Sequence, residues 1–249
     1  MNWKKWEELP AEMQTPEVRE YYDILSRKRH SLFWKRVFDI AASLSLLTIL
    51  SPVFLILAIA IKIDSKGPVF YRQERVTQYG SRFRIFKFRT MVTDADKMGM
   101  RITLKQDDRI TRVGRLIRKC RLDEICQLID VLRGTMTFVG TRPEVPEYVA
   151  KYDKRMLATL LLPAGITSRA SVLYKDEDAI LSSAEDANKA YIEEILPQKM
   201  AINLRALRRF GFWDDISVLI MTVLAVLGKK YEDESEPSEL TNQEIEYKK

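Results

Sequence analysis

Two adjacent carboxylates, Asp123 and Glu124, stand inside the basic segment RKCRLDEICQLIDVLRG at positions 118–134. Such a pair is a candidate for carboxylate chemistry, and a metal bound there would be a hard cation held by oxygen, such as Mg²⁺. An Asp-Glu pair by itself is usually a solvated surface feature. The arginines around it raise the question of whether they only neutralise the carboxylates or also bind an anionic ligand.

The composition narrows the available chemistry to carboxylates, lysines and arginines. The chain has only two cysteines, Cys120 and Cys126, and one histidine, His30, so it offers neither zinc-site spacing nor a disulfide framework. With 249 residues, 46% hydrophobic and 31% charged, the chain is long enough for a sizeable core and is not wholly disordered.

The charge is unevenly distributed along the chain. The net charge is +6, but the tail 231–249 holds seven acidic residues and two lysines, which leaves +11 for residues 1–230. A strongly basic body favours an anionic partner such as a phospholipid surface, a phosphorylated substrate or nucleic acid. The acidic tail has no apolar period and is predicted to be a disordered, solvated end.

A run of 22 uncharged residues at 40–61 has the length of a bilayer-spanning helix. Pro52 in its middle removes the hydrogen bond to the Thr48 carbonyl, so the helix should break at Ser51-Pro52. Both flanks are basic, whereas a spanning helix normally shows a bias to one side. These features favour a helix that enters one leaflet and returns, and a kinked transmembrane helix is the alternative.

The elements around this run are mostly helical. A polar helix should begin at the Thr15 cap before Pro16, and another should cover 186–209. Val69–Val76 and Arg82–Arg89 read as a hairpin, with a bulge at Phe86 where the alternation of basic and apolar residues slips. Arginines at every third position from 109 to 121 predict a basic amphipathic segment.

Two further elements concern the carboxylate pair and the C-terminus. Asp123 and Glu124 should lie near the start of a helix, where backbone N–H groups favour anions. That helix would carry an apolar stripe formed by Leu122, Ile125, Leu128, Ile129 and Leu132. The apolar stretch Ile216–Leu227 is too short to cross a bilayer, so it is either an interfacial helix or a buried C-terminal helix.

Taken together, several segments resemble the bacterial sugar transferases, which are monotopic phosphoglycosyl transferases. The matching segments are residues 35–76, FRIFKFRTM at 83–91, residues 108–134, FVGTRPEVPEY at 138–148 and PAGITSRASV at 163–172. Their order and spacing carry the resemblance, since no single segment is specific enough. It implies a mainly α fold with a small β-hairpin, a re-entrant helix broken at Ser51-Pro52 and interfacial amphipathic helices.

With these elements, the resemblance divides the chain into five parts. They are a polar helical segment (1–34), a re-entrant membrane helix (35–64), a cytosolic catalytic domain (65–200), C-terminal interfacial helices (201–230) and the acidic tail (231–249).

The resemblance also implies a reaction, with Asp123 and Glu124 as its catalytic pair. Asp123 would attack the β-phosphate of a UDP-sugar, release UMP and hold the phosphosugar covalently until polyprenyl phosphate accepts it. Glu124 would be associated with Mg²⁺. By the resemblance, the candidate phosphate-binding residues are Arg75, Lys87, Arg89, Arg112, Arg115, Arg142 and Arg169, and Lys87 and Arg142 are the preferred ones.

The implied partners are a UDP-sugar, polyprenyl (undecaprenyl) phosphate and membrane lipid, with the active site at the cytosolic face of the bacterial inner membrane. No RNP, KH or zinc-finger pattern points to nucleic acid, and a homodimer is left open. The sequence departs from the family pattern at Ile125-Cys126, at Thr141 and over 168–172, which leaves the transferred sugar and the glycan pathway unassigned. A membrane-anchored binder of anionic lipid or nucleic acid, without chemistry, is the alternative from another class.

Overall fold

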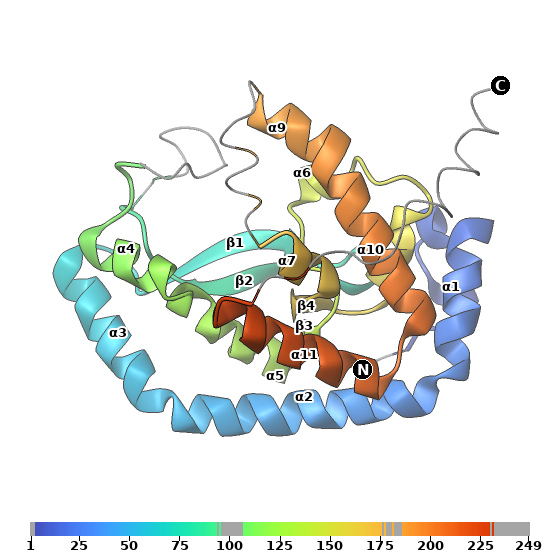
Figure 1. Ribbon diagram of the computed structural model, residues 1–249, viewed down its shortest axis with the longest axis horizontal. Coiled ribbons are helices and arrows are strands. Elements are labelled where there is room, and N and C mark those ends of the chain that lie inside the picture. Colours follow the sequence, from blue (N-terminus) through green and yellow to red (C-terminus); the bar gives the residue numbers. More distant parts are fainter. Residues whose placement is uncertain are drawn as a thin grey trace.

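The computed structural model describes residues 3–93, 95, 107–175, 177, 181, 186–229 and 231. Helices dominate, and the strands form two separate two-stranded sheets (Figure 1). The helices are α1 (Pro16–Arg27), α2 (Arg29–Ile49), α3 (Ser51–Asp64), α4 (Arg112–Lys119), α5 (Leu128–Arg133), α6 (Pro146–Val149), α7 (Arg169–Leu173), α9 (Ala187–Ala190), α10 (Leu196–Arg209) and α11 (Phe212–Val226). The strands are β1 (Phe70–Val76), β2 (Arg82–Phe88), β3 (Met136–Val139) and β4 (Ala164–Thr167).

The predicted break in the apolar run is confirmed. α2 and α3 meet at Leu50 and are bent by 60°, so the described chain has no single helix long and apolar enough to cross a membrane, although the bent pair has that length and composition. The Thr48 carbonyl, which loses its partner at Pro52, accepts a hydrogen bond from the Ser51 hydroxyl at 2.8 Å. Ser51 therefore helps to stabilise the bend that Pro52 causes.

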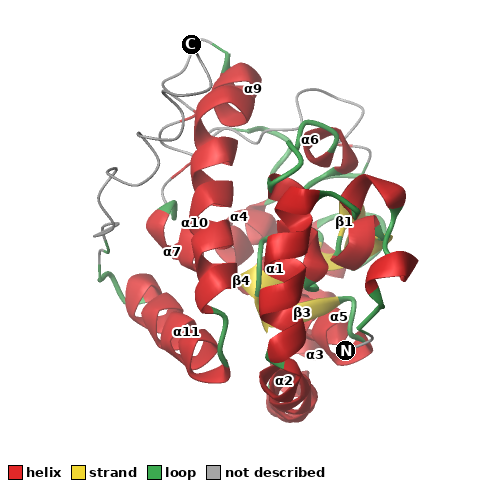
Figure 2. Cartoon of the chain, turned by 90° about the vertical axis from the view of Figure 1, so that its right-hand side faces the viewer, coloured by secondary structure: helices red, strands yellow, loops and turns green. Residues whose placement is uncertain are grey.

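The long helix α2 runs along one side of the domain, with α3 turning away from its end to meet α4 (Figure 1). Figure 2 looks nearly along α2 and shows the rest of the domain on one side of it. The buried face of α2 is mainly polar, since Lys35, Asp39 and Ser43 are at most 2% exposed, with Leu32 as its apolar member. The opposite face is apolar and exposed, as Ile40 and Leu44 illustrate.

The polar face of α2 is joined to β3 by hydrogen bonds and to α11 by an ion pair. Asp39 accepts bonds from the Thr137 hydroxyl at 2.7 Å and from the Phe138 N–H at 3.2 Å. Lys35 pairs with Asp215 of α11 and donates to the Val139 carbonyl. These bonds connect the broken helix pair to the strand that leads to the loop at 140–145.

The hairpin of β1 and β2 is confirmed, but the predicted bulge at Phe86 is wrong. The register is continuous from the pair Phe70–Phe88 to the pair Val76–Arg82. Apolar residues occupy both faces of β2 because both are partly covered. Ile85 packs with Val131 and Met136, whereas Phe88 packs in another cluster with α3 and α4.

A second sheet, in which β3 and β4 pair in parallel, was not predicted as such. Only the run at β3 reads as strand-like in the sequence, because each strand has just four residues and its partner lies far along the chain. Gly140 and Gly165 allow the two strands to approach closely, since a Cβ on Gly165 would lie 2.2 Å from the Gly140 carbonyl oxygen. The carboxyl ends of β3 and β4 therefore leave the sheet side by side.

The terminal helices meet the predictions in part. Thr15 caps α1, which packs with α10 and residues 158–162 in the largest core cluster. α11 has no buried residue, with Trp213 and Val226 more than 70% exposed, so the alternative of a buried C-terminal helix is wrong. The basic segment at 109–121 is helical only over α4. The acidic residues 232–249 lie outside the described part of the chain.

We predict that Asp39→Ala lowers the free energy of unfolding by about 2–4 kcal/mol, because it leaves the buried Phe138 N–H and Thr137 hydroxyl without their acceptor. Thermal unfolding of the purified protein in detergent checks this. Asp23→Ala serves as the control, because it removes an exposed pair with Arg19 and should change stability by less than about 1 kcal/mol. Equal losses in both variants would contradict the anchoring role of Asp39.

Candidate active site

Asp123 and Glu124 lie in the first turn of a 3₁₀ helix, Leu122–Gln127, that runs directly into α5. Arg121 precedes it in the left-handed conformation (φ 55°) and turns the chain out of α4. The predicted position at a helix start is confirmed, but the turn is 3₁₀ and not α. The predicted apolar stripe is accordingly wrong in part, since Cys126 is fully buried while Ile129 and Leu132 are only half-buried.

Glu124 is an almost buried carboxylate held by two cations. The Lys87 ammonium donates to Oε1 at 3.0 Å, and Arg142 Nη2 donates to the same oxygen. Its side chain is 15% exposed. Burial alone would raise the pKa of Glu124, but Arg142 and Lys87 outweigh it and hold the pKa well below its usual range. Glu124 is therefore ionised throughout the physiological pH range.

Lys87 and Arg142 reach Glu124 from different parts of the fold. Lys87 lies on β2, which packs along the 3₁₀ helix. Arg142 follows β3, where its Nη1 also donates to the Ile166 carbonyl of β4 at 3.3 Å. The loop start is fixed because Gly140 N–H donates to Thr167 and Gly165 N–H donates to Thr141. Lys87 and Arg142 thus converge on Glu124.

Asp123 differs sharply from its neighbour. Within the described part of the chain its carboxylate forms no ion pair and no hydrogen bond with another side chain. Burial and the adjacent Glu124 charge raise the pKa of Asp123, and Lys87 and Arg118 partly offset this. A half-buried carboxylate without a bonded cation is free to approach a ligand.

Arg118, on α4, was not singled out in the sequence as a site residue. Its guanidinium acts on Asp123 electrostatically and donates from Nε to the Thr90 hydroxyl at 3.0 Å. The close approach of α4 to Thr90 requires Gly114, where a Cβ would lie 2.1 Å from the Thr90 carbonyl oxygen. The only sequence signal was the spacing of the arginines, which does not distinguish Arg118 from Arg112 or Arg115.

Two of the other predicted cations are partly engaged elsewhere. Arg75 donates to the Pro143 carbonyl at 3.1 Å, so it supports the loop that carries Arg142. Burial lowers the pKa of Arg75, and Glu144 acts against this. Arg89 is 5% exposed and donates to Ser65 at the end of α3, with no bond to either carboxylate.

The remaining three cations are exposed. Arg112 and Arg115 lie on the outer side of α4 and Arg169 lies in the first turn of α7. None of them contacts Asp123 or Glu124 in the described structure, so their role in phosphate binding stays a prediction.

Comparison with known proteins identifies the family of the chain. The family model described as bacterial sugar transferase matches residues 30–229. The chain belongs to the bacterial sugar transferase family. The resemblance inferred from the motifs is therefore confirmed, and the match extends the region it covers at both ends.

Curated relatives carry more specific names. An undecaprenyl-phosphate glucose phosphotransferase of Komagataeibacter xylinus is 35% identical over 76% of this chain. A UDP-glucose:undecaprenyl-phosphate glucose-1-phosphate transferase of Caulobacter vibrioides is 33% identical over 78% of it. A UDP-N-acetylgalactosamine-undecaprenyl-phosphate N-acetylgalactosaminephosphotransferase of Aeromonas hydrophila is 32% identical over 78%.

The matches cover different shares of these relatives. They span 35% of the Komagataeibacter protein, 44% of the Aeromonas protein and 69% of the Caulobacter protein. Two of the three relatives are thus much longer than the sugar transferase region that they share with this chain.

The donor atoms of this sugar transferase fit a hard cation that also binds substrate phosphate. The described residues contain no group of three potential protein ligands, but Mg²⁺ is commonly held by one or two carboxylates with phosphate and water completing its shell. Both cations on Glu124 contact Oε1, and Oε2 has no bonded partner in the described structure. Glu124 Oε2 and Asp123 are therefore the candidate ligands.

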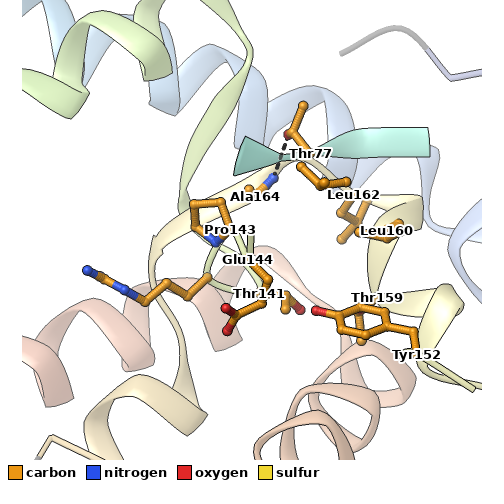
Figure 3. A pocket seen from close by; sticks show the side chains of 11 residues that line it. Thr77, Thr141, Pro143, Glu144, Tyr152, Thr159, Leu160, Leu162 and Ala164 are labelled. Carbon is orange, nitrogen blue, oxygen red and sulfur yellow. Dashed lines mark hydrogen bonds between the residues drawn. The ribbon is translucent and has the colours of Figure 1, made fainter. Parts of the chain in front are cut away.

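A small pocket lies behind the Arg142 loop (Figure 3). It is lined by the end of β1 and the following Thr77, by loop residues that include Glu144, by Tyr152 and by residues of the segment 159–164. The Tyr152 hydroxyl points into the pocket toward Glu144, whose charge adds to burial in raising the pKa of Tyr152. The Thr77 hydroxyl accepts a hydrogen bond from the Ala164 N–H and so ties β1 to β4.

We predict that Arg142→Gln lowers the free energy of unfolding by about 2–4 kcal/mol, because Glu124 keeps its buried charge with only Lys87 to compensate it. Adding Glu124→Gln should recover part of this loss, with a coupling energy of about 1–3 kcal/mol in a double-mutant cycle. Chemical denaturation of the four proteins measures it. Arg82→Gln, which removes an exposed pair with Glu74, is the control, and additive losses from Arg142→Gln and Glu124→Gln would contradict the pairing.

Proposed function

We propose that this chain transfers a sugar-1-phosphate from a UDP-sugar to undecaprenyl phosphate and releases UMP. The names of the relatives support the reaction class. The observation that carries the proposal is the contrast between the two carboxylates. Glu124 is neutralised by two cations, whereas Asp123, beside it, is left without a bonded cation.

In the first step Asp123 attacks the β-phosphorus of the UDP-sugar. A bond forms between the carboxylate oxygen and phosphorus, and the bond from that phosphorus to the bridging oxygen breaks, so that UMP leaves with the electron pair. The products are UMP and an aspartyl phosphosugar. A carboxylate is a weak nucleophile, but dividing the transfer into two displacements lowers the barrier of each.

In the second step a phosphate oxygen of undecaprenyl phosphate attacks the same phosphorus. The bond to Asp123 breaks and the carboxylate is regenerated, so the lipid leaves as an undecaprenyl diphosphate sugar. The same carboxylate thus serves as nucleophile and leaving group. Its raised pKa makes it a better nucleophile than a carboxylate fully bound by arginine.

The positive groups around the pair have separate tasks. Arg118 and Lys87 lie close enough to Asp123 to offset part of the rise in its pKa. They can therefore also neutralise the charge of a phosphate that approaches Asp123. Arg142 fixes Glu124 through Oε1 and leaves Oε2 for Mg²⁺. Mg²⁺ held there would neutralise the diphosphate and stabilise the charge that develops on the leaving UMP.

We further propose that the α2–α3 pair lies in the cytosolic leaflet of the bacterial inner membrane. The bend of 60° and the exposed apolar face of both helices support this. The large exposed apolar residues of α2 and α3 include Val37, Ile40, Leu44, Ile49, Leu55, Ile56, Ile59 and Ile63. α11, which packs against α2, adds Trp213, Ile220, Val223 and Val226, and the basic face of α4 suits lipid headgroups.

The non-enzymatic alternative is a membrane-anchored protein that only binds an anion. Asp123 argues against it, because an unpaired carboxylate among arginines weakens the binding of an anion. The sugar is not assigned by this argument. The relatives themselves divide between glucose and N-acetylgalactosamine.

We predict that the protein in nanodiscs releases UMP from one member of a UDP-sugar panel with Mg²⁺, and that Asp123→Asn lowers this release by at least about a thousandfold, as expected for loss of a nucleophile. Mass spectrometry of the protein incubated with its donor alone should show the added phosphosugar on the peptide containing Asp123. The control is Asp108→Asn, which changes an aspartate that contacts neither carboxylate.

Two results would contradict the proposal. Full activity of Asp123→Asn would exclude Asp123 as the nucleophile. Failure to release UMP with every donor, while binding of anionic vesicles improves in Asp123→Asn, would favour the non-enzymatic alternative.

The re-entrant arrangement predicts that tags at residue 1 and at residue 249 are accessible from the same side of the inner membrane, because the chain enters and leaves one leaflet. Protease protection in spheroplasts and in inverted vesicles measures the side of each tag. A known single-span protein carrying the same tags is the control. Tags on opposite sides would support the kinked transmembrane helix instead.

A further inference from the structure

A network of polar side chains, most of them buried, lies behind the Arg142 loop and takes no part in the two proposed transfer steps. The Tyr191 hydroxyl donates to Glu144 Oε1 at 2.5 Å. The Lys199 ammonium lies 3.4 Å from that hydroxyl and donates to Glu177 Oε2 at 2.8 Å. Glu144, Tyr191 and Lys199 are each less than 8% exposed. Such a network is stable only when its members are mutually satisfied.

The network joins two segments that leave the same edge of the parallel sheet. Glu144 is two residues beyond Arg142 in the loop that follows β3. Glu177 belongs to the segment that follows β4 and α7. Tyr191 and Lys199 reach these two acids from one continuous helical stretch that ends with α10. This helical stretch is therefore bonded to the loop after β3 at Glu144 and to the segment after α7 at Glu177.

The helix is irregular at the point of contact. Tyr191–Ile195 form a π-helical turn that leads into α10. Pro197, at the start of α10, has no N–H to donate to the carbonyl four residues earlier, which accounts for the interrupted α-helical hydrogen bonding. π-helical turns are rare and occur often at functional sites.

Electrostatics keeps Tyr191 the donor in its hydrogen bond with Glu144. Burial and the nearby Glu144 carboxylate raise the pKa of Tyr191, so the phenol stays protonated and remains a donor. Arg75 and Arg142 also interact electrostatically with Glu144. Arg75 also binds the Pro143 carbonyl. The Glu144 side chain is thus bonded to Tyr191 and interacts electrostatically with two arginines, two residues beyond Arg142 in the chain.

We propose that Tyr191 and Lys199 are positioning residues, which act through Glu144 to hold the loop in the place where Arg142 reaches Glu124. This role rests on the proposed function, because Arg142 matters for catalysis only if the carboxylate pair is the active site. The backbone of the loop is also bonded to β1, since the Val76 N–H donates to the Glu144 carbonyl at 2.9 Å, whereas the hydrogen bond to the Glu144 side chain comes from Tyr191. The pocket of Figure 3 lies between the loop and residues 159–162.

Tyr191→Phe removes the hydroxyl and leaves the ring in place. We expect its kcat for UMP release to fall about tenfold, the size of one lost hydrogen bond to a charged group, with KM for the UDP-sugar within about twofold. In an Arg142→Lys background the same change should have less than about a twofold effect, since the residue through which Tyr191 acts is already altered. Lys199→Met should act in the same direction as Tyr191→Phe.

Amide hydrogen exchange supplies a readout that needs no activity. Exchange in the peptide spanning residues 141–149 should rise at least about threefold in Tyr191→Phe, because its contact to the π-helical turn at Tyr191–Ile195 is weakened. The matched control is Tyr22→Phe, which removes the hydroxyl of an equally buried tyrosine that donates to the Lys4 carbonyl in the core cluster of α1. This control should change neither the exchange of the loop nor kcat.

The outcomes separate the two proposals. Wild-type exchange in the loop of Tyr191→Phe would overturn the positioning role, as would an equal loss of kcat with and without Arg142→Lys. If the wild type releases no UMP with any donor, the proposed function fails, and the exchange comparison still decides whether Tyr191 holds the loop.

Discussion

The buried charge of Glu124 is the constraint on which the arrangement of this domain depends. An ionised carboxylate that is mostly removed from water is tolerated only with close cations. The two cations come from β2 and from the loop after β3, which are distant in sequence. β2 must therefore pack against the 3₁₀ helix, and the loop after β3 must bring Arg142 within reach of Glu124. Displacing either one leaves the buried charge with only one of its two cations.

The position of the Arg142 loop depends in turn on the broken helix pair. β3 sets the start of the Arg142 loop, and β3 is itself held by Asp39 and Lys35 on the buried face of α2. The helix is thus polar where it meets protein and apolar where it is exposed, the reverse of a helix on a water-soluble domain. This inverted pattern suits a helix whose outer face meets lipid. In that case the helix that contacts the membrane also fixes the position of the active-site loop.

Much of the fold was predictable because local physical rules decide it. Pro52 cannot donate a backbone hydrogen bond, so the helix break follows from one residue, and Thr15 before Pro16 marks a helix start in the same way. The prediction of a bulge in β2 was wrong for a reason that the alternation of apolar and basic residues cannot reveal. Both faces of the strand are covered by different clusters, so apolar residues on both faces do not require a change of register.

The site was predictable only as far as motif and charge type could take it. Asp123, Glu124, Lys87 and Arg142 were identified and are brought together. The position of Arg118 beside Asp123 depends on how α4 packs against Thr90, which no spacing of arginines encodes. The short strand β4 and the network behind the loop depend equally on tertiary contacts between distant residues.

The division of labour between two adjacent carboxylates is the last consequence of this packing. Residues next to each other in a chain normally share one environment, but the 3₁₀ turn directs Glu124 toward Lys87 and Arg142 and leaves Asp123 without a bond to either. The pKa of Glu124 is lowered and the pKa of Asp123 is raised, so the two neighbouring carboxyl groups have opposite pKa shifts. Paired carboxylates with opposed pKa shifts are a recurring way to assign different tasks to chemically equal groups. The permanently ionised Glu124 is suited to hold a cation, and the less stabilised charge of Asp123 is suited to form a bond.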